Sequence, residues 1–347
     1  MQIISLERAV KLGLDTVHVF TQDCFGDSIM FGAAARALVR QTGRPVLIGT
    51  KSGNYGLLRG IDDDLPAPIY ILDGYYGRMV NTANVKKLAR RGIKLNYFGQ
   101  SWTEKILPEI AVAMGFSGTV DLPLYVRADE SLSVSDKPYI TIMTGGRVAR
   151  KAMPIGLLQS IIKKYKGKYN FVQLGTDDDQ LLSDVIDMRG KLSLDSEIPT
   201  VIKNSALFIG SEGLLMHIAA ATQTRAVIGD GWMGRLTGNA GHIHIFPKKL
   251  LPVMRKEDSP GDMETLDEKE FMNAIAIQLK EQGKPFPKNM IDLDGATANR
   301  RRIKHDSMTV NIIDLLWRSA AGILRGRGLP HERINAVKYK IKYGLSA

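Results

Sequence analysis

An acid and a histidine stand five residues apart in the segment FIGSEGLLMHIAAA, at 208–221. The apolar run at its start is typical of a strand, and the apolar residues after Gly213 have helical spacing. Glu212 stands at the expected strand exit, where a carboxylate can accept hydrogen bonds from ribose or sugar hydroxyls, and His217 follows roughly one turn later. The start of the helix would favour an anion such as a diphosphate. The alternative is that Glu212 caps the helix and that His217 is a partly buried histidine with satisfied hydrogen bonds.

A second carboxylate, Asp27, stands at another expected strand-to-helix turn. The β-branched and aromatic run TVHVF, at 16–20, precedes the polar segment TQDCFGD, and helical spacing begins at Ser28. A carboxylate at such a turn could take a proton while an oxygen attacks an anomeric carbon. Helix capping is the alternative, because Asp is a common N-cap residue.

A glycine-containing turn followed by cations is expected within TIMTGGRVARKAMP, at 141–154. Thr144, Gly145 and Gly146 can bring backbone N–H groups close to a diphosphate, because glycine permits a close approach. The cations that follow are Arg147, Arg150 and Lys151. A solvated basic loop is the alternative.

These turns need strands and helices to position them, and the hydrophobic pattern predicts both. Strands are expected at 16–20, 45–50, 68–74, 93–99, 139–146, 169–176, 206–213 and 225–231, and helices at 28–43, 84–92, 154–167, 178–188, 198–205 and 214–222. Strands that alternate with helices in this way form parallel sheets. The fold class is therefore α/β, with two Rossmann-like, doubly wound domains whose strand carboxyl ends face each other across a cleft.

A polar, acidic stretch at 126–138 lacks an apolar period and is the best candidate for a linker. It predicts an N-terminal domain at 1–135 and a C-terminal domain at 136–305. The remaining segment, 306–347, combines a strongly apolar face with a basic tail in which Tyr and Ile are interleaved. A helix that packs back on the domains is expected there, and contact with an anionic membrane surface is the alternative.

Composition limits the compartment and the partners. The 347-residue chain has one cysteine, Cys24, which excludes an intramolecular disulfide and fits a reducing compartment. It has no apolar run long enough to span a membrane and no signal-peptide pattern at its start, so we expect a cytoplasmic protein. The net charge of +11 favours an acidic partner: a nucleic acid, an anionic lipid surface or a phosphorylated substrate.

The three motifs together resemble those of glycosyltransferase family 9, the ADP-heptose:lipopolysaccharide heptosyltransferases. In that family an acid, a small residue and a following histidine open a helix of the second domain, and Glu212, Gly213 and His217 match them. The Gly-Asp pair before the first helix of the family is matched by Gly26 and Asp27. The family usually has Asp as the acid of the first motif and a Gly-Pro-Thr turn where this chain has GDGWMGRLTGNAG, so the donor sugar stays open.

The resemblance implies a GT-B type fold and a role for each matching residue. Asp27 would be the base that deprotonates the acceptor hydroxyl, with Gly26 and Ser28 on the acceptor side. Lys151 would neutralise the departing nucleoside diphosphate. The implied donor-binding residues are Thr144, Gly145, Gly146, Lys151, Glu212, Gly213, Met216 and His217, and the second domain would be the nucleotide-sugar-binding one.

The implied function is inverting transfer of heptose or a related sugar from a nucleoside-diphosphate donor to a hydroxyl of lipopolysaccharide or another glycan. No cofactor is expected beyond the donor itself, which is ADP-heptose in the family. The partners would be a nucleotide sugar and an acidic glycan or glycolipid acceptor at the inner membrane face. Two alternatives stay open: transfer to a modified base of a nucleic acid, and a non-catalytic, nucleotide-binding partner module.

Two acidic triplets and one histidine pair could suggest a metal site. The triplet at 62–64 falls in an expected loop, and the triplet at 177–179 opens an expected helix, where acids suit the helix dipole. His242 and His244 alternate on one face of an expected strand without a third ligand nearby, so zinc is not expected. We therefore expect no metal in the site.

Overall fold

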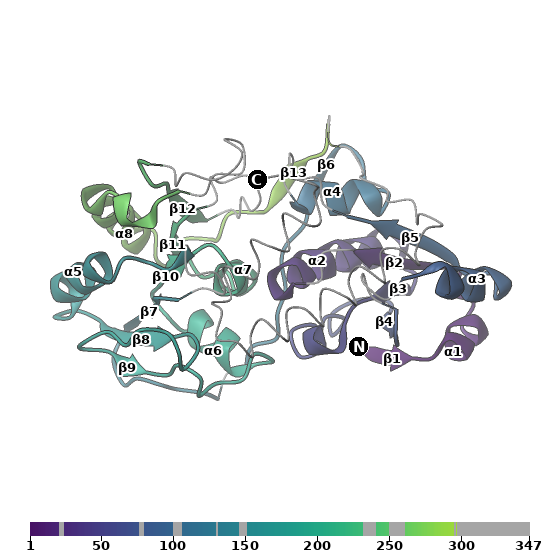
Figure 1. Ribbon diagram of the computed structural model, residues 1–347, viewed down its shortest axis with the longest axis horizontal. Coiled ribbons are helices and arrows are strands. Elements are labelled where there is room, and N and C mark those ends of the chain that lie inside the picture. The colour runs from purple at the N-terminus through teal and green to yellow at the C-terminus, as the bar shows by residue number, and fades with distance from the viewer. Residues whose placement is uncertain are drawn as a thin grey trace, which may run out of the picture.

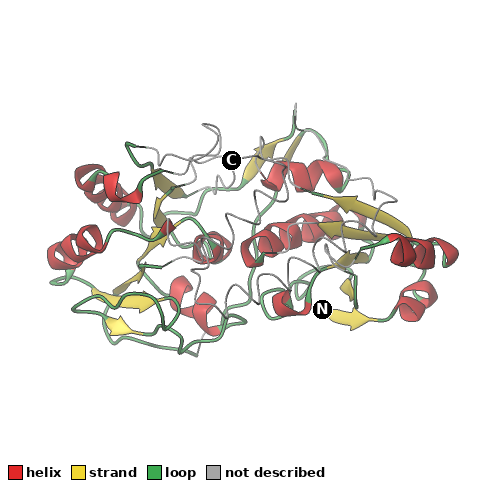
Figure 2. Ribbon diagram, in the orientation of Figure 1, coloured by secondary structure: helices red, strands yellow, loops and turns green. Residues whose placement is uncertain are grey.

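The computed structural model describes residues 1–20, 24–75, 80–99, 106–129, 131–145, 151–231, 241–249, 261–294 and 296. Two parallel β-sheets, one from each half of the chain, lie side by side in Figure 1. Figure 2 shows that helices flank the strands of both sheets. The expected α/β class with parallel sheets is therefore confirmed.

The first sheet has the strand order β1-β4-β3-β2-β5, and all neighbouring strands are parallel. Its strands are β1 (Gln2–Ile4), β2 (Thr16–Phe20), β3 (Val46–Gly49), β4 (Ile69–Leu72) and β5 (Lys94–Phe98). The helices of this half are α1 (Leu6–Lys11), α2 (Phe25–Thr42), the 3-10 turn η1 (Ser52–Asn54), α3 (Thr82–Arg90) and α4 (Ile106–Ala113). Since α2 follows β2, which pairs with β3 and β5, its N-terminus lies at the carboxyl edge of this sheet.

The second sheet has the order β12-β11-β10-β7-β8-β9, again with parallel neighbours. Its strands are β7 (Tyr139–Met143), β8 (Asn170–Leu174), β9 (Ile186–Asp187), β10 (Leu207–Ser211), β11 (Ala226–Gly229) and β12 (His242–Ile245). Its helices are α5 (Ile155–Tyr165), α6 (Glu197–Lys203), α7 (Leu214–Ala221), the 3-10 turn η4 (Met263–Thr265) and α8 (Glu268–Lys280). Strands β7, β10 and β11 are buried at every residue, as expected for a parallel sheet covered on both faces.

A small antiparallel pair brings the end of the described chain back to the first half. β6 (Thr119–Asp121) pairs with β13 (Met290–Asp292), and Leu293 donates its N–H to the carbonyl of Gly118 at 3.1 Å. The chain therefore crosses between the two halves a second time after α8. The division into domains at 1–135 and 136–305 stays a prediction. The whole segment 306–347 lies outside the described residues, and so do its two predicted roles.

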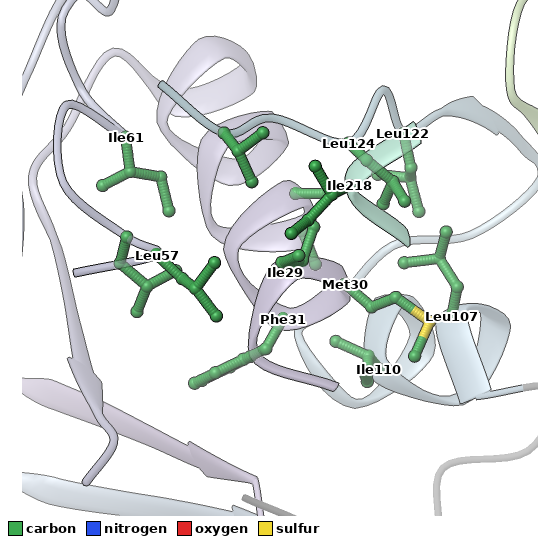
Figure 3. Packing of buried hydrophobic residues seen from close by; sticks show 14 of the residues in the cluster. Ile29, Met30, Phe31, Leu57, Ile61, Leu107, Ile110, Leu122, Leu124 and Ile218 are labelled. Carbon is green, nitrogen blue, oxygen red and sulfur yellow. The ribbon is translucent and has the colours of Figure 1, made fainter. Parts of the chain in front are cut away.

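One hydrophobic cluster extends across the junction of the two halves. Figure 3 shows Ile29 and Met30 of α2 close to Ile218 of α7, with Leu107 and Ile110 of α4 on the other side. All five are buried. Because the N-terminal turns of α2 and α7 carry the candidate motifs, this shared apolar contact fixes the position of one motif relative to the other.

The helix expected at 178–188 is absent, and the prediction of that helix was wrong. Asp179 accepts a hydrogen bond from the N–H of Thr176 at 2.8 Å, and Gln173 of β8 accepts one from the N–H of Leu182 at 2.9 Å and donates one to the carbonyl of Gln180 at 2.8 Å. Side chains thus satisfy the backbone groups that a helix would have paired. The segment forms turns and the short strand β9 instead.

In the described part of the chain, no helix has the length and apolar character needed to cross a membrane.

Candidate active site

Two turns at the carboxyl edge of the second sheet carry the donor-side candidates. β10 ends at Ser211, and Gly213 is the N-cap of α7, so Glu212 stands in the turn between strand and helix. β7 ends one residue before Thr144. Since β10 and β7 pair in parallel, both turns leave the same edge of the sheet.

Lys151 and Glu212 form an ion pair that joins these two turns. Nζ of Lys151 lies 2.7 Å from Oε2 of Glu212, and the two side chains are 24% and 10% exposed. The N–H of Glu212 also donates to the carbonyl of Gly229 at 3.2 Å, which ties the same turn to the end of β11. The Glu212 carboxylate is therefore held at the edge of the sheet, and the Lys151 ammonium beside it is the more exposed of the two groups.

The motif of the first half meets that of the second where Gly26 faces His217. A Cβ atom at Gly26 would lie 2.5 Å from Cδ2 of the His217 ring, a distance that real Cβ atoms essentially never show. Glycine is therefore required here because of the imidazole of the other half. The sequence singled out both residues, and the structure brings them into contact.

Asp27 lies in the first turn of α2, and its carboxylate accepts hydrogen bonds from the backbone N–H and the thiol of the N-cap residue Cys24. Burial raises the pKa of the Asp27 carboxyl to about 7. The negative charge of Glu212 adds to this rise, whereas the Cys24 donors and the charge of Lys151 oppose it. The alternative that Asp27 is the N-cap of the helix was wrong, because Cys24 is the N-cap residue and the Asp27 carboxylate reaches back to it from the first turn. A carboxyl group that titrates near neutral pH is also suited to act as a base.

His217 is 4% exposed, and it is neutral at pH 7. Its pKa is lowered to about 3, because burial disfavours the imidazolium and because the charges of Lys151 and His244 repel it. Its Nδ1 is buried and has no hydrogen-bond partner among the described residues. The alternative of a histidine with satisfied hydrogen bonds therefore does not hold within the described chain, and one ring nitrogen is free to bind a polar ligand atom.

The turn after β7 is occupied by internal contacts. The Thr144 hydroxyl donates to the carbonyl of Gln180 at 3.1 Å and accepts a hydrogen bond from Gln173 at 3.1 Å. A Cβ at Gly145 would lie 1.6 Å from Oδ1 of Asp179, so the glycine makes room for that carboxylate. A role of Thr144 and Gly145 in donor binding stays a prediction, one that the Thr144 side chain does not support. Gly146, Arg147 and Arg150 lie outside the described residues.

Three other predicted site residues differ in their surroundings. Met216 is fully buried in the hydrophobic cluster, where its side chain packs. The Ser28 hydroxyl donates to the carbonyl of Cys24 at 3.1 Å and accepts a hydrogen bond from Asn54 at 2.5 Å, so it supports the turn that holds Asp27. A Cβ at Gly213 would meet no atom of the described residues within 4 Å, so these residues leave space in front of the α7 N-terminus.

The acidic triplets have internal partners. Asp64 pairs with Arg36 and Arg40, and Arg189 donates to the carbonyl of Asp179. The triplet at 177–179 lies in a turn and does not open a helix, contrary to the prediction. Among the residues that the structure describes, no group of three or more His, Cys, Asp or Glu side chains is arranged to hold a metal ion.

One pair was missed by the sequence analysis. Nδ1 of His244 lies 2.9 Å from Oδ2 of Asp230, the residue that follows β11 and is 1% exposed. The alternation of His242 and His244 was seen in the sequence, but Asp230 was not linked to it. Such a partner could have been found only from the parallel pairing of β11 with β12.

Comparisons with known proteins find likeness in structure alone. No protein-family model matches the chain, and no curated protein matches it in sequence. The structure of the glycosyl transferase family 9 protein from Veillonella parvula matches with a TM-score of 0.60 at 13% identity, covering 77% of this chain and 98% of that one. The iron-containing dodecameric glycosyltransferase TibC from enterotoxigenic E. coli matches with a TM-score of 0.58 at 13% identity, covering 77% and 76%. The E. coli ADP-heptose LPS heptosyltransferase II matches with a TM-score of 0.55 at 15% identity, covering 77% and 99%.

These likenesses agree with the two parallel sheets and with the helices that flank them. The chain therefore shares the GT-B type α/β fold of the glycosyl transferase family 9 structures, the fold that its motifs had predicted.

Proposed function

We propose that this protein is a glycosyltransferase that moves a sugar from a nucleoside-diphosphate donor to an acceptor hydroxyl. The observation that carries the proposal is the meeting of Asp27 with Lys151, Glu212 and His217 at the junction of the two halves. One side supplies a carboxyl group that titrates near neutral pH, and the other supplies a cation, a carboxylate and a neutral imidazole at the start of a helix. The shared fold with glycosyl transferase family 9 structures supports the same reaction class.

Each residue then has a task that follows from its surroundings. Asp27 takes the proton of the acceptor hydroxyl as its oxygen attacks the anomeric carbon. The departing diphosphate is stabilised by Lys151 and by the N-terminus of α7, because both carry positive charge toward it. Glu212 accepts hydrogen bonds from donor hydroxyls, and His217 binds a polar donor atom through its free ring nitrogen.

The finer assignment follows the structural neighbours. E. coli heptosyltransferase WaaC has been solved with ADP, and TibC in complex with ADP-D-beta-D-heptose, so ADP-heptose is the first donor to test. Attack on the face opposite the diphosphate would invert the anomeric centre. We include in the proposal that the transfer needs no metal, since Lys151 and the α7 N-terminus would take the charge of the leaving group. The net charge of +11 supports an acidic glycan or glycolipid acceptor.

The proposal is tested by incubating the protein with a panel of nucleotide sugars and measuring released nucleoside diphosphate, with and without EDTA. We expect release with at least one donor, insensitive to EDTA, and its loss in Asp27→Asn. A thermal-shift series with ADP, UDP, GDP and CDP is the first step, because a bound nucleotide raises the melting temperature by mass action. If none of the four moves it, the donor-binding assignment is wrong.

A further inference from the structure

The pair of Asp230 and His244 lies next to the candidate site and has no role in it so far. Nδ1 of His244 is 2.9 Å from Oδ2 of Asp230, and the carboxylate is 1% exposed. A carboxylate accepts hydrogen bonds, so the contact with Asp230 favours the tautomer of His244 that carries its proton on Nδ1 and leaves Nε2 as an acceptor. Nε2 is buried, and within the described part of the chain it has no hydrogen-bond partner.

The register of the sheet places His244 on the side of α7. His244 of β12 lies opposite Ile228 of β11, and residues opposite each other in neighbouring strands point to the same face. Ile228 belongs to the hydrophobic cluster that contains Ile218 of α7. His244 therefore faces the helix that carries His217, and the two histidines are near enough to interact electrostatically.

The strand order indicates which end of a donor would reach His244. β11 and β12 lie on one side of β10, whereas β7, β8 and β9 lie on the other. In the proposed reaction the anomeric carbon must lie beside Asp27, and the first half touches the second at His217 on α7. The sugar would therefore lie on the His217 side of the diphosphate, toward β11 and β12, which is the side of the sheet that carries His244.

We propose that the Asp230–His244 pair recognises the donor sugar: Nε2 of His244 accepts a hydrogen bond from a sugar hydroxyl, and Asp230 fixes the tautomer that makes Nε2 an acceptor. This inference rests on the proposed function and adds the part of the donor that the pair would contact. A buried acceptor discriminates against a ligand that lacks the hydroxyl, because the acceptor then stays unpaired. His244 would thus help decide which sugar the protein accepts.

The test compares two ligands that differ only in the sugar. Calorimetric binding is measured for the nucleoside diphosphate, among ADP, UDP, GDP and CDP, that binds the wild type most tightly, and for its best-binding sugar conjugate. His244→Phe keeps a planar ring without nitrogens, and we expect it to weaken the conjugate about fivefold to tenfold with no change for the free diphosphate. His244→Gln, which offers an amide oxygen, should recover part of the loss, and Asp230→Asn should show a smaller loss.

His242→Phe is the matched control, since it makes the same replacement two positions away on the same face of β12. It should leave both affinities unchanged. Melting temperatures without ligand show whether each variant is folded. If His244→Phe does not fold, the affinities of His244→Gln and Asp230→Asn for the sugar conjugate test the inference.

Three outcomes count against the inference, and they are distinguishable. Unchanged affinity of folded His244 variants for the conjugate would mean that solvent satisfies Nε2, and would overturn the inference while the proposed function stands. Equal weakening of conjugate and free diphosphate would overturn the assignment to the sugar. A wild type that binds none of the four nucleotides would overturn the proposed function, and the inference with it.

Discussion

The two sides of the candidate site hold their carboxylates in different ways. The Asp27 carboxylate accepts hydrogen bonds from Cys24 at the start of α2, and burial raises the pKa of Asp27 to about 7. Glu212 lies 2.7 Å from the ammonium of Lys151 in an ion pair between two turns of the second sheet. The first carboxyl can therefore change its protonation state near neutral pH, whereas the second has a cation beside it that stabilises its charge.

His217 of the second side, like Glu212, differs from Asp27 in that it is not suited to take up a proton near neutral pH. Burial and two neighbouring charges lower the pKa of His217 to about 3, so its charge does not change in the neutral range. The second half thus presents a neutral imidazole and an ion pair, while the first half presents a group that can move a proton. Such a separation is what a transferase with one base and one binding side requires.

The largest test of this division is Asp27→Asn. The amide cannot take a proton, so we expect turnover to fall by about a hundredfold to ten-thousandfold, measured as nucleoside diphosphate released in the presence of acceptor. Donor affinity should change little, because the donor is held by the other half. A variant with near wild-type turnover would remove Asp27 from the chemistry.

Asp27→Asn should lower turnover but should raise stability above neutral pH. The folded Asp27 carboxyl has a raised pKa, so between the unfolded value of 3.8 and about 7 the folded protein binds the proton more strongly than the unfolded chain. The free energy of unfolding contributed by this group is therefore present below pH 4 and falls as pH rises through 7. Asp27→Asn should melt at a higher temperature than the wild type at pH 8, and the difference should shrink at pH 5.

Lys151→Met should have the next largest effect, on binding. It removes the cation proposed to meet the diphosphate and leaves the Glu212 carboxylate, which is 10% exposed, without that partner. We expect nucleoside diphosphate affinity to fall about tenfold to a hundredfold, the range for a hydrogen bond to a charged group. Lys166→Met is a control, since Lys166, the C-cap residue of α5, forms an exposed ion pair with Asp184 at 2.8 Å. If Lys151→Met lowers stability but leaves affinity intact, the pair is structural.

The sequence was informative where a motif is local. The strand that ends at Ser211 and the helix from Leu214 to Ala221 were predicted almost to the residue, because apolar periodicity and the Gly-Ser-Glu-Gly break lie within one short segment. The contact of Gly26 with His217 could be expected only from the resemblance, since nothing in either segment names the other.

The failures came from side chains that act over a distance. The helix expected at 178–188 has helical apolar spacing and acids at its start, yet Gln173 of β8 binds its backbone and prevents the helix. The sequence also did not indicate that Gln180 and Gln173 bind the Thr144 hydroxyl, whereas the role of the Thr144 backbone N–H in donor binding stays a prediction. The Asp230–His244 pair needs the register of two strands, which no pattern in the chain specifies.

Two glycine replacements compare the packing of the halves. Gly26→Ala would place a methyl group 2.5 Å from the His217 ring, so the ring or α7 must move. We expect the free energy of unfolding, from urea titration, to fall by about 1–3 kcal/mol, as for overpacking, with a loss of activity. Gly213→Ala has extended backbone and places its methyl group near no atom of the described residues. Its stability should therefore be unchanged, and any loss of donor affinity would come from the methyl group in front of α7. Equal destabilisation by both replacements would contradict the contact between Gly26 and His217.

The smallest expected effect tests whether the two sides act on each other at all. Glu212 raises the pKa of Asp27 through its negative charge, and Lys151 lowers it. Glu212→Gln should therefore shift the rise of kcat/KM with pH to lower pH than the wild-type value near 7, because the repelling charge is gone while the Lys151 cation remains. Lys151→Met should shift it to higher pH, and the opposite signs exclude a general loss of structure as the cause. A pH profile that moves in neither variant would mean that Asp27 and the ion pair are electrostatically separate, and that the two halves do not form one site.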